Sequence, residues 1–168
     1  LAISSAVYLI WKHPLADVCS RSIAPVGLFF AVLTLITGSL WGKPMWGTWW
    51  VWDARLTSML ILTIFYISFI ALSNAFDREV DGSKPASILS ILGAINLPII
   101  KFSVDWWNTL HQPSSILRLD GPTISNEMLL PLSIMMIGFF CFSTYIIVVN
   151  IKIKLMNKKY NSLMLKSN

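Results

Sequence analysis

The chain has 168 residues, of which 55% are hydrophobic and only 12% are charged, and its mean hydropathy is +0.67. An ordinary soluble domain carries about 25% charged residues, so this composition excludes a soluble globular fold and indicates a membrane protein. The formal net charge is +5. Its basic residues are scattered between apolar stretches and gathered at the C-terminus, a pattern that reports membrane orientation rather than a nucleic-acid partner.

Sequence motifs for several other site types are missing. The two cysteines, Cys19 and Cys141, lie in different segments and form no C-x-x-C pair, so the sequence predicts neither a disulfide framework nor a zinc site. There is no phosphate-binding G-x-x-x-x-G-K-[ST] loop. Any step driven by ATP must therefore belong to a partner.

The apolar stretches define the fold class. Residues 1–11 are about half as long as the roughly 20 residues that a spanning helix needs, and we expect them to be the end of a truncated helix. Four stretches long enough to span follow, at residues 23–40, 56–76, 86–104 and 128–151. The sequence predicts an all-α polytopic membrane helix bundle, with four complete transmembrane helices plus a partial one, in a single membrane domain over residues 1–168.

The third of these stretches contains polar and helix-breaking residues, namely Asn96, Pro98 and Lys101. Such residues persist at membrane depth only where neighbouring helices or a cavity satisfy their polar groups. We expect that condition to hold here.

The basic residues predict the orientation. Alternating the connectors places nine lysines and arginines on one side, which the positive-inside rule makes cytoplasmic, or matrix in a mitochondrion. These nine are Lys12, Arg21, Arg78, Lys84 and, in the basic inner tail 152–168, Lys152, Lys154, Lys158, Lys159 and Lys166. The other side receives four, which are Lys43, Arg55, Lys101 and Arg118. The connectors 41–55 and 105–127 then share the outer side, where they can build one site.

The connector 41–55 reads WGKPMWGTWWVWDAR. It holds five of the eight tryptophans, which are Trp41, Trp46, Trp49, Trp50 and Trp52. An aromatic belt at the membrane interface would spread its indoles over several helix ends, whereas these are gathered in one connector with two glycines and a proline. If the second half of the connector is helical, Trp46, Trp49 and Trp50 fall on one side with Asp53, at i, i+3, i+4, i+7 spacing. The pattern favours a ligand platform over a plain belt.

A planar macrocycle is the natural partner of such a broad, rigid apolar surface. Haem is a macrocycle of this kind, and its two carboxylates need cations or hydrogen-bond donors, which Lys43 and Arg55 can supply. Several roles stay open for Asp53. It can pair with Arg55, hold a loop backbone, orient a donor, remain solvated, or cap the helix that begins before Leu56.

Haem iron also needs an axial ligand, which is commonly a histidine. His111 follows the pair Trp106–Trp107 in the second outer connector and shares the predicted side of the tryptophan cluster, so it is the candidate ligand. A lone histidine is more often structural or solvated. The other histidine, His13, lies beside Pro14 in an inner connector and is interpreted as a surface residue.

The segments WGKPMWGTWWVWDARLTS and INLPIIKFSVDWWNTLHQP closely resemble the CcmC family, the haem-delivery proteins of cytochrome c maturation system I within the haem handling protein superfamily. The resemblance covers residues 6–151. The tryptophan-rich WWD motif alone would leave the CcmF and CcsA-type families open, and WWNTLHQP narrows the match. The resemblance implies six helices in the full protein, with both termini inside, in a bacterial or mitochondrial inner membrane.

The resemblance also implies a function. CcmC-like proteins bind haem b non-covalently at the outer face and deliver it to the haem chaperone CcmE for c-type cytochrome biogenesis, alongside the CcmA–CcmB pair and CcmD. By motif position, the axial histidine of the second outer loop corresponds to His111. The family's other axial histidine lies in a first outer loop upstream of Leu1, and His13 does not replace it because its predicted side is wrong. The implied haem site comprises Trp41, Lys43, Trp46, Trp49, Trp50, Trp52, Asp53, Arg55 and His111.

No nucleophile or acid–base pair stands out in the outer connectors, which favours a transfer factor over an enzyme that performs group chemistry. Other functions stay open. A haem transporter or exporter subunit predicts ionisable groups deep in several spans, which only Lys101 approaches. A buried bis-histidine cytochrome predicts histidines inside the spans, and these spans contain none. A structural subunit predicts only a dense aromatic belt, and a haem lyase component of the CcmF or CcsA type also remains an alternative.

Overall fold

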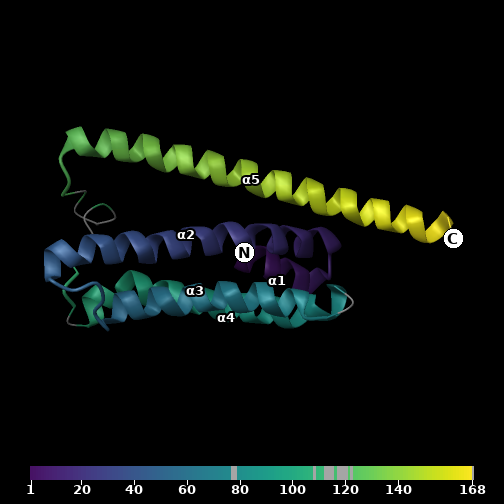
Figure 1. Ribbon diagram of the computed structural model, residues 1–168, viewed down its shortest axis with the longest axis horizontal. Coiled ribbons are helices and arrows are strands. Elements are labelled where there is room, and N and C mark those ends of the chain that lie inside the picture. Colours follow the sequence, from purple (N-terminus) through teal and green to yellow (C-terminus); the bar gives the residue numbers. More distant parts are fainter. Residues whose placement is uncertain (77–78, 108, 112–115, 117–120, 122, 168) are drawn as a thin grey trace.

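A computed structural model of the chain describes residues 1–76, 79–107, 109–111, 116, 121 and 123–167. Arg78 and Arg118, which were counted for orientation, lie outside these residues, as do Asn108, Gln112 and Pro113 of the WWNTLHQP motif. The described residues form five helices and no strand (Figure 1): α1 (Ala2–Trp11), α2 (Pro14–Trp46), α3 (Ala54–Asn74), α4 (Glu79–Trp106) and α5 (Asn126–Ser167). Helices α2 to α5 are long and apolar enough to cross a membrane. The predicted all-α membrane fold is confirmed.

Helices α2, α4 and α5 extend beyond the apolar stretches predicted for them. Helix α2 continues to Trp46, so the connector 41–55 is not all loop, and α5 carries the basic tail 152–168 as part of one helix up to Ser167. Hydropathy marks the length of chain that suits lipid, whereas capping residues decide where a helix ends. Lysine is a good helix former, so the basic tail continues α5 past its apolar part.

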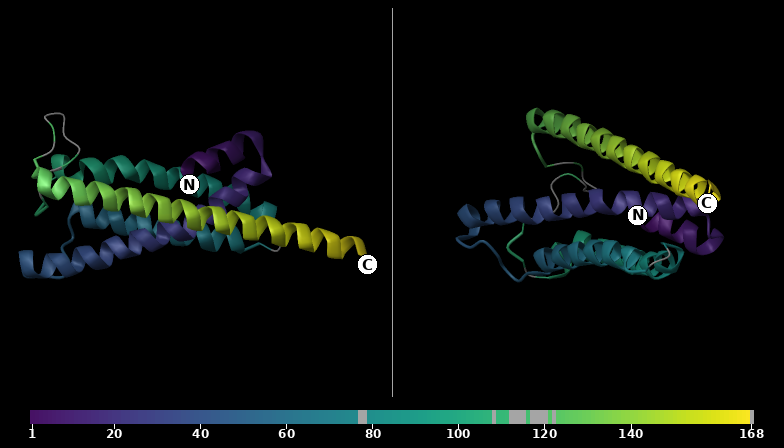
Figure 2. Two further views of the ribbon diagram at one scale, coloured as in Figure 1. Left: turned by 90° about the horizontal axis from the view of Figure 1, so that it is seen from above. Right: turned by 45° about the vertical axis from the view of Figure 1, so that its right-hand side comes forward.

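The helices form a bundle with one outlying member. Helices α3 and α4 pack side by side, α2 lies against α3, and the short α1 packs against α2 and α4. Helix α5 crosses at an angle, and its contacts are chiefly with α2, which it approaches toward its C-terminal half (Figures 1 and 2). No residue in the most apolar stretch of α5 is buried.

Small side chains fill the interior of the bundle. The core cluster consists of Ala24, Phe69 and Ala86. The bundle also contains fully buried serines, which are Ser5, Ser20, Ser22, Ser83, Ser87 and Ser103. Small residues let membrane helices approach closely and form hydrogen bonds across their interfaces, so close contact between backbones holds this bundle together.

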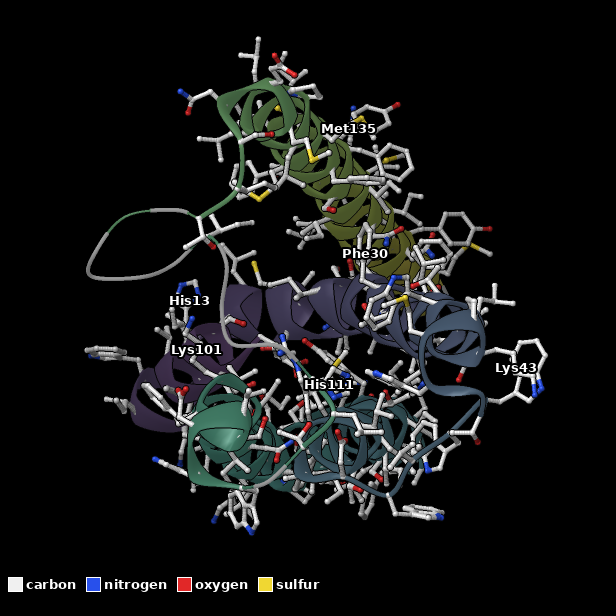
Figure 3. All side chains as sticks on the ribbon, turned by 90° about the vertical axis from the view of Figure 1, so that its left-hand side faces the viewer. His13, Phe30, Lys43, Lys101, His111 and Met135 are labelled. Carbon is white, nitrogen blue, oxygen red and sulfur yellow. The ribbon has the colours of Figure 1, made fainter. Side chains whose placement is uncertain are left out.

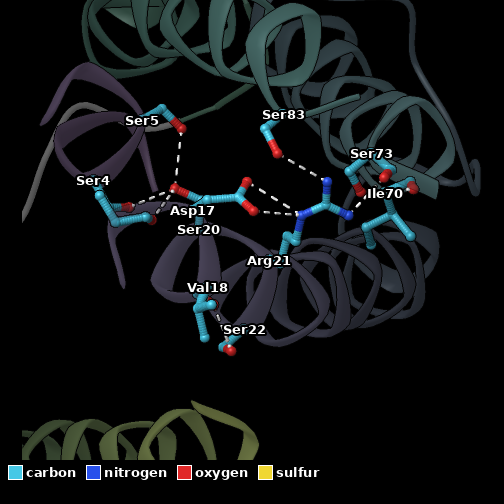
Figure 4. Close-up of polar contacts among 11 residues, drawn as sticks. Ser4, Ser5, Asp17, Val18, Ser20, Arg21, Ser22, Ile70, Ser73 and Ser83 are labelled. Carbon is cyan, nitrogen blue, oxygen red and sulfur yellow. Dashed lines mark hydrogen bonds and ion pairs between the residues drawn. The ribbon is translucent and has the colours of Figure 1, made fainter. Parts of the chain in front are cut away.

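A buried ion pair links three helices at the end of the bundle opposite to the tryptophan-rich connector 41–55. Nε of Arg21 donates to Oδ2 of Asp17 at 3.0 Å, one turn earlier on α2. The guanidinium also donates to the Ser73 carbonyl at 2.6 Å and to the Ser83 hydroxyl at 3.1 Å, which joins α2 to α3 and α4 (Figure 4). Arg21 is therefore a structural residue as well as an orientation marker.

A second polar contact joins α3 and α4 nearer the tryptophan-rich connector 41–55. The buried amide of Asn96 donates to the backbone carbonyl of Ser58 at 2.7 Å. A neighbouring helix thus satisfies this polar group at membrane depth, whereas Pro98 and Lys101 are exposed. The contact lies about one helical turn from the start of α3, where the site begins.

Candidate functional site

The site lies where α2 ends and α3 begins. Gly47 ends α2 with a φ of 76°, a left-handed conformation that glycine adopts without strain, and its N–H donates to the Lys43 carbonyl. Residues 47–53 then cross to α3 without helical structure. The helical spacing considered for Trp49, Trp50 and Asp53 is therefore wrong, because Gly47 stops the helix before the second half of the connector.

Asp53 connects the two parts of the site. Its Oδ1 accepts a 2.8 Å hydrogen bond from the N–H of Leu56 and so caps α3. Its Oδ2 accepts from the Thr109 hydroxyl at 2.7 Å and lies 2.7 Å from Nδ1 of His111. Of the roles left open by the sequence, capping the helix and orienting a donor are the two that Asp53 performs, and the described residues show no ion pair between it and Arg55.

The contact with Asp53 fixes the tautomer of a neutral His111 ring. A carboxylate only accepts hydrogen bonds, so Nδ1 carries the proton and donates it to Oδ2. The other ring nitrogen, Nε2, then keeps its lone pair, and no described residue is hydrogen-bonded to it. The His111 side chain is 17% exposed, so the site is partly open to a ligand.

Thr109 and Trp46 hold the ring in place. The N–H of His111 donates to the Thr109 hydroxyl at 2.9 Å, which forms a tight turn before the histidine. Trp46, the last residue of α2, meets the imidazole edge-on with 4.6 Å between ring centroids. Figure 3 looks onto this end of the bundle and shows His111 where α2 meets α3 and α4.

The charge of Asp53 supports this assignment. Burial raises the pKa of its carboxyl, but hydrogen bonds from Leu56, Thr109 and His111 favour the charged form. Together they lower the pKa of Asp53 below its ordinary value of 3.8. Asp53 is therefore ionised at neutral pH and is available as an acceptor for the Nδ1 proton.

Gly42 and Trp41 support Trp46 from the α2 side. A Cβ at Gly42 would lie 3.2 Å from the Trp46 ring, so the glycine lets the indole lie close to the helix backbone. Trp41 packs edge-on against Trp46, with 5.2 Å between the ring centroids. A continuous set of ring contacts therefore runs from Trp41 through Trp46 to His111.

The remaining tryptophans of the connector form an exposed apolar surface. Trp49 is 54% exposed and Trp52 is 75% exposed. Trp50 is half-buried and packs edge-on against Trp52 at 5.4 Å. Its indole Nε1 is buried and has no hydrogen-bond partner among the described residues. A buried donor in this state costs about 1–3 kcal/mol, so this N–H is well suited to an acceptor on a ligand.

The two candidate cations differ in their surroundings. Nζ of Lys43 donates to the Gly47 carbonyl at 3.0 Å and lies 5.7 Å from the centroid of the Trp49 ring. It points away from His111 at the edge of the bundle (Figure 3). Arg55 is half-buried in the first turn of α3, and no described residue forms a hydrogen bond or ion pair with its guanidinium. Arg55 is therefore the better placed of the two to receive an anion.

Sequence reasoning missed Thr109, although a hydroxyl two residues before His111 is a pattern typical of a turn. His13 is exposed, as interpreted from the sequence. It caps α2 at the other end of the bundle, where its Nδ1 accepts from the N–H of Leu15 at 3.3 Å.

Comparison with known proteins identifies the family. The sequence profile of CcmC, described as "Heme exporter protein C", matches residues 1–166. The "Heme exporter protein C" of Bradyrhizobium diazoefficiens is 54% identical over 139 residues, which cover 83% of this chain and 53% of that protein. The protein of the same name from Escherichia coli K12 is 43% identical over 161 residues, or 95% of this chain and 64% of that protein.

A mitochondrial relative shows the same similarity. The "Putative cytochrome c biosynthesis ccmC-like mitochondrial protein" of Marchantia polymorpha is 51% identical over 140 residues, or 83% of this chain and 58% of that protein. The chain thus spans between about half and two thirds of the length of these curated relatives. Its apolar helices and these relatives make it an integral membrane protein, and the chain belongs to the CcmC family, which is described as heme exporter protein C.

Proposed function

We propose that this chain binds haem at the tryptophan-rich end of the bundle, with Nε2 of His111 as an axial ligand of the iron, and delivers the haem to the chaperone CcmE for c-type cytochrome maturation. The observation that carries the proposal is the 2.7 Å contact between Asp53 Oδ2 and His111 Nδ1. The names of the relatives, which refer to heme export and cytochrome c biosynthesis, support haem as the cargo.

The donor chemistry fits this cargo. Metal-binding histidines usually donate their second ring N–H to a carboxylate or carbonyl, which fixes the tautomer and makes the ligand more basic. His111 has this arrangement with Asp53. Within the described residues no group of three or more His, Cys, Asp or Glu could hold a metal ion. A single histidine suits iron whose equatorial ligands come from a macrocycle.

The connector between α2 and α3 offers groups that suit the rest of the haem. The exposed rings of Trp49 and Trp52 offer flat apolar area, and Nε1 of Trp50 and the guanidinium of Arg55 can donate to its carboxylates. Lys43 already donates one of its three N–H groups to the Gly47 carbonyl, so it is less available than Arg55. The binding is non-covalent, as for haem b, because the chain has no C-x-x-C-H motif.

We assign the site to the periplasmic or intermembrane side. The count of basic residues supports this orientation. A flat ligand held between two connectors keeps an exposed edge, so a side chain of CcmE can reach its vinyl groups. CcmA–CcmB and CcmD are the proposed partners, and the ATP-driven step falls to CcmA–CcmB because this chain has no phosphate-binding loop.

The test compares the two histidines in full-length, detergent-purified protein. We expect His111→Ala to lower haem affinity at least tenfold, measured from the Soret absorbance, and to reduce transfer to CcmE. His13→Ala is the matched control, since His13 is exposed at the opposite end, and it should leave both unchanged. Unchanged haem binding in His111→Ala would refute the ligand assignment, and a wild-type protein without a Soret band would favour a structural role.

A further inference from the structure

A polar cavity of about 150 Å³ lies between α2 and α5, at the end of the bundle opposite to His111. On the α2 side it is lined by Val18 and Arg21. On the α5 side it is lined by Lys154, Asn157, Lys158 and Asn161. A water molecule needs about 10–15 Å³ of such space, so the cavity has room for a phosphate group.

The positive charge of this cavity comes from α5. Lys154 and Lys158 are one helical turn apart, so they lie on the same face of the helix. The guanidinium of Arg21 is turned the other way, toward Ser73 and Ser83, while α5 passes on the Val18 side of α2 (Figure 4). Of the described residues that line the cavity, none is a carboxylate. Two ammonium groups and two side-chain amides therefore surround a space suited to an anion.

The position of the cavity along the membrane normal indicates which kind of anion it binds. The apolar part of α5 ends near Ile151, so the lysines of the cavity lie where a spanning helix meets the headgroup region. Basic pockets between transmembrane helices on the positive side of the membrane suit anionic headgroups. Beyond the lysines toward the bilayer, Phe139 of α5 meets Phe30 of α2 edge-on at 5.9 Å. Acyl chains attached to a headgroup in the cavity can follow these exposed apolar faces.

We propose that this cavity between α5 and α2 binds the phosphate of an anionic phospholipid headgroup through Lys154 and Lys158. Lipid can reach this place, because the apolar stretch of α5 has no buried residue and its contacts with the bundle are chiefly with α2. Free inorganic phosphate shares the chemistry of the headgroup. It has no acyl chains, so it would gain nothing from the apolar faces beside the cavity.

The test uses two double variants that remove the same charge from the same helix. Lys154→Gln/Lys158→Gln changes the cavity. Lys152→Gln/Lys159→Gln is the matched control, because these two lysines lie along a different face of α5 with Val148. Binding of phosphatidylglycerol and of zwitterionic phosphatidylcholine to the full-length protein is measured by native mass spectrometry, with size-exclusion chromatography to confirm folding.

We expect a preference for phosphatidylglycerol that falls about fivefold for each lysine removed from the cavity, and a change of less than twofold in the control. Equal losses in both double variants would overturn the proposal, since they would indicate diffuse attraction to the basic helix. Displacement of the lipid by millimolar inorganic phosphate would overturn the assignment to a lipid. Neither result depends on haem binding at His111.

Discussion

Replacing Asp53 by asparagine separates the two tasks of this residue. Asparagine caps helices about as well as aspartate, so its oxygen can keep the 2.8 Å contact with the N–H of Leu56. Its other terminal atom is then an amide nitrogen, which donates and cannot accept. This nitrogen faces the Thr109 hydroxyl and Nδ1 of His111, both of which donate to Asp53 in the native protein. If the amide flips instead, the cap of α3 is lost.

The expected loss of haem affinity in Asp53→Asn follows from the change in the tautomer of His111. To keep a hydrogen bond with the new amide, Nδ1 must become the acceptor, and the ring proton moves to Nε2, where it blocks the proposed bond to iron. Losing a partner of this kind lowers metal affinity about 10–100-fold, which corresponds to ~1.4–2.7 kcal/mol. We expect Asp53→Asn to weaken haem binding by about this factor. The free energy of unfolding should change by no more than ~1 kcal/mol, the usual value of an N-cap.

The assay is a haem titration of the full-length protein in detergent, followed by the Soret absorbance. Thr109→Val is the control, because it removes a donor to the same oxygen without reversing the Nδ1 contact, and it should cost less than tenfold. In a His111→Ala background, Asp53→Asn should have no further effect. Unchanged affinity in Asp53→Asn, or an equal loss when His111 is absent, would refute the reasoning.

The difference in stability between wild type and Asp53→Asn should depend on pH. Because the folded protein lowers the pKa of Asp53 below 3.8, its carboxylate contributes stability that is present above the unfolded value and is lost as the pH falls through the folded value. The difference in Tm between wild type and Asp53→Asn should therefore be constant above about pH 5 and shrink below about pH 4. A difference that disappeared above pH 5 would contradict the ionised, hydrogen-bonded carboxylate.

Three further substitutions test the scaffold by thermal unfolding. Gly47→Ala should cost about 1–2 kcal/mol, because φ is 76° there, whereas Gly38→Ala should not destabilise, because a Cβ at Gly38 would meet nothing within 4 Å; equal losses would contradict the backbone argument. Asn96→Leu should cost about 1 kcal/mol through its lost hydrogen bond, and an unchanged Tm would show that this contact contributes nothing. Arg21→Ala should cost about 3–5 kcal/mol because it leaves Asp17 buried and unpaired, and Arg21→Ala/Asp17→Asn should recover part of that loss; no recovery would contradict the ion-pair account.

Much of the fold could be predicted from local sequence. The four spans follow from apolar stretches of about 20 residues, since a helix of that length matches the hydrocarbon thickness of a bilayer. The helix ends were less predictable. Gly47 stops α2 only after it has carried Trp46 past the apolar stretch, and hydropathy contains no information about such a cap.

The candidate site was predictable in composition and only partly in geometry. The tryptophan cluster and the placement of His111 with it follow from composition and from the alternation of connectors. The sequence did not predict which partners Asp53 would bind, because each of the possible partners was chemically reasonable.

Only the tertiary structure decided that choice. Packing α4 beside α3 brings Thr109 and His111 to the start of α3, where Asp53 already caps the helix. The same packing buries Arg21 at the opposite end, although its charge alone predicts a solvated residue. Hydropathy and capping act within about one turn or one span of the chain, whereas the tautomer of His111 depends on a contact between residues 58 positions apart.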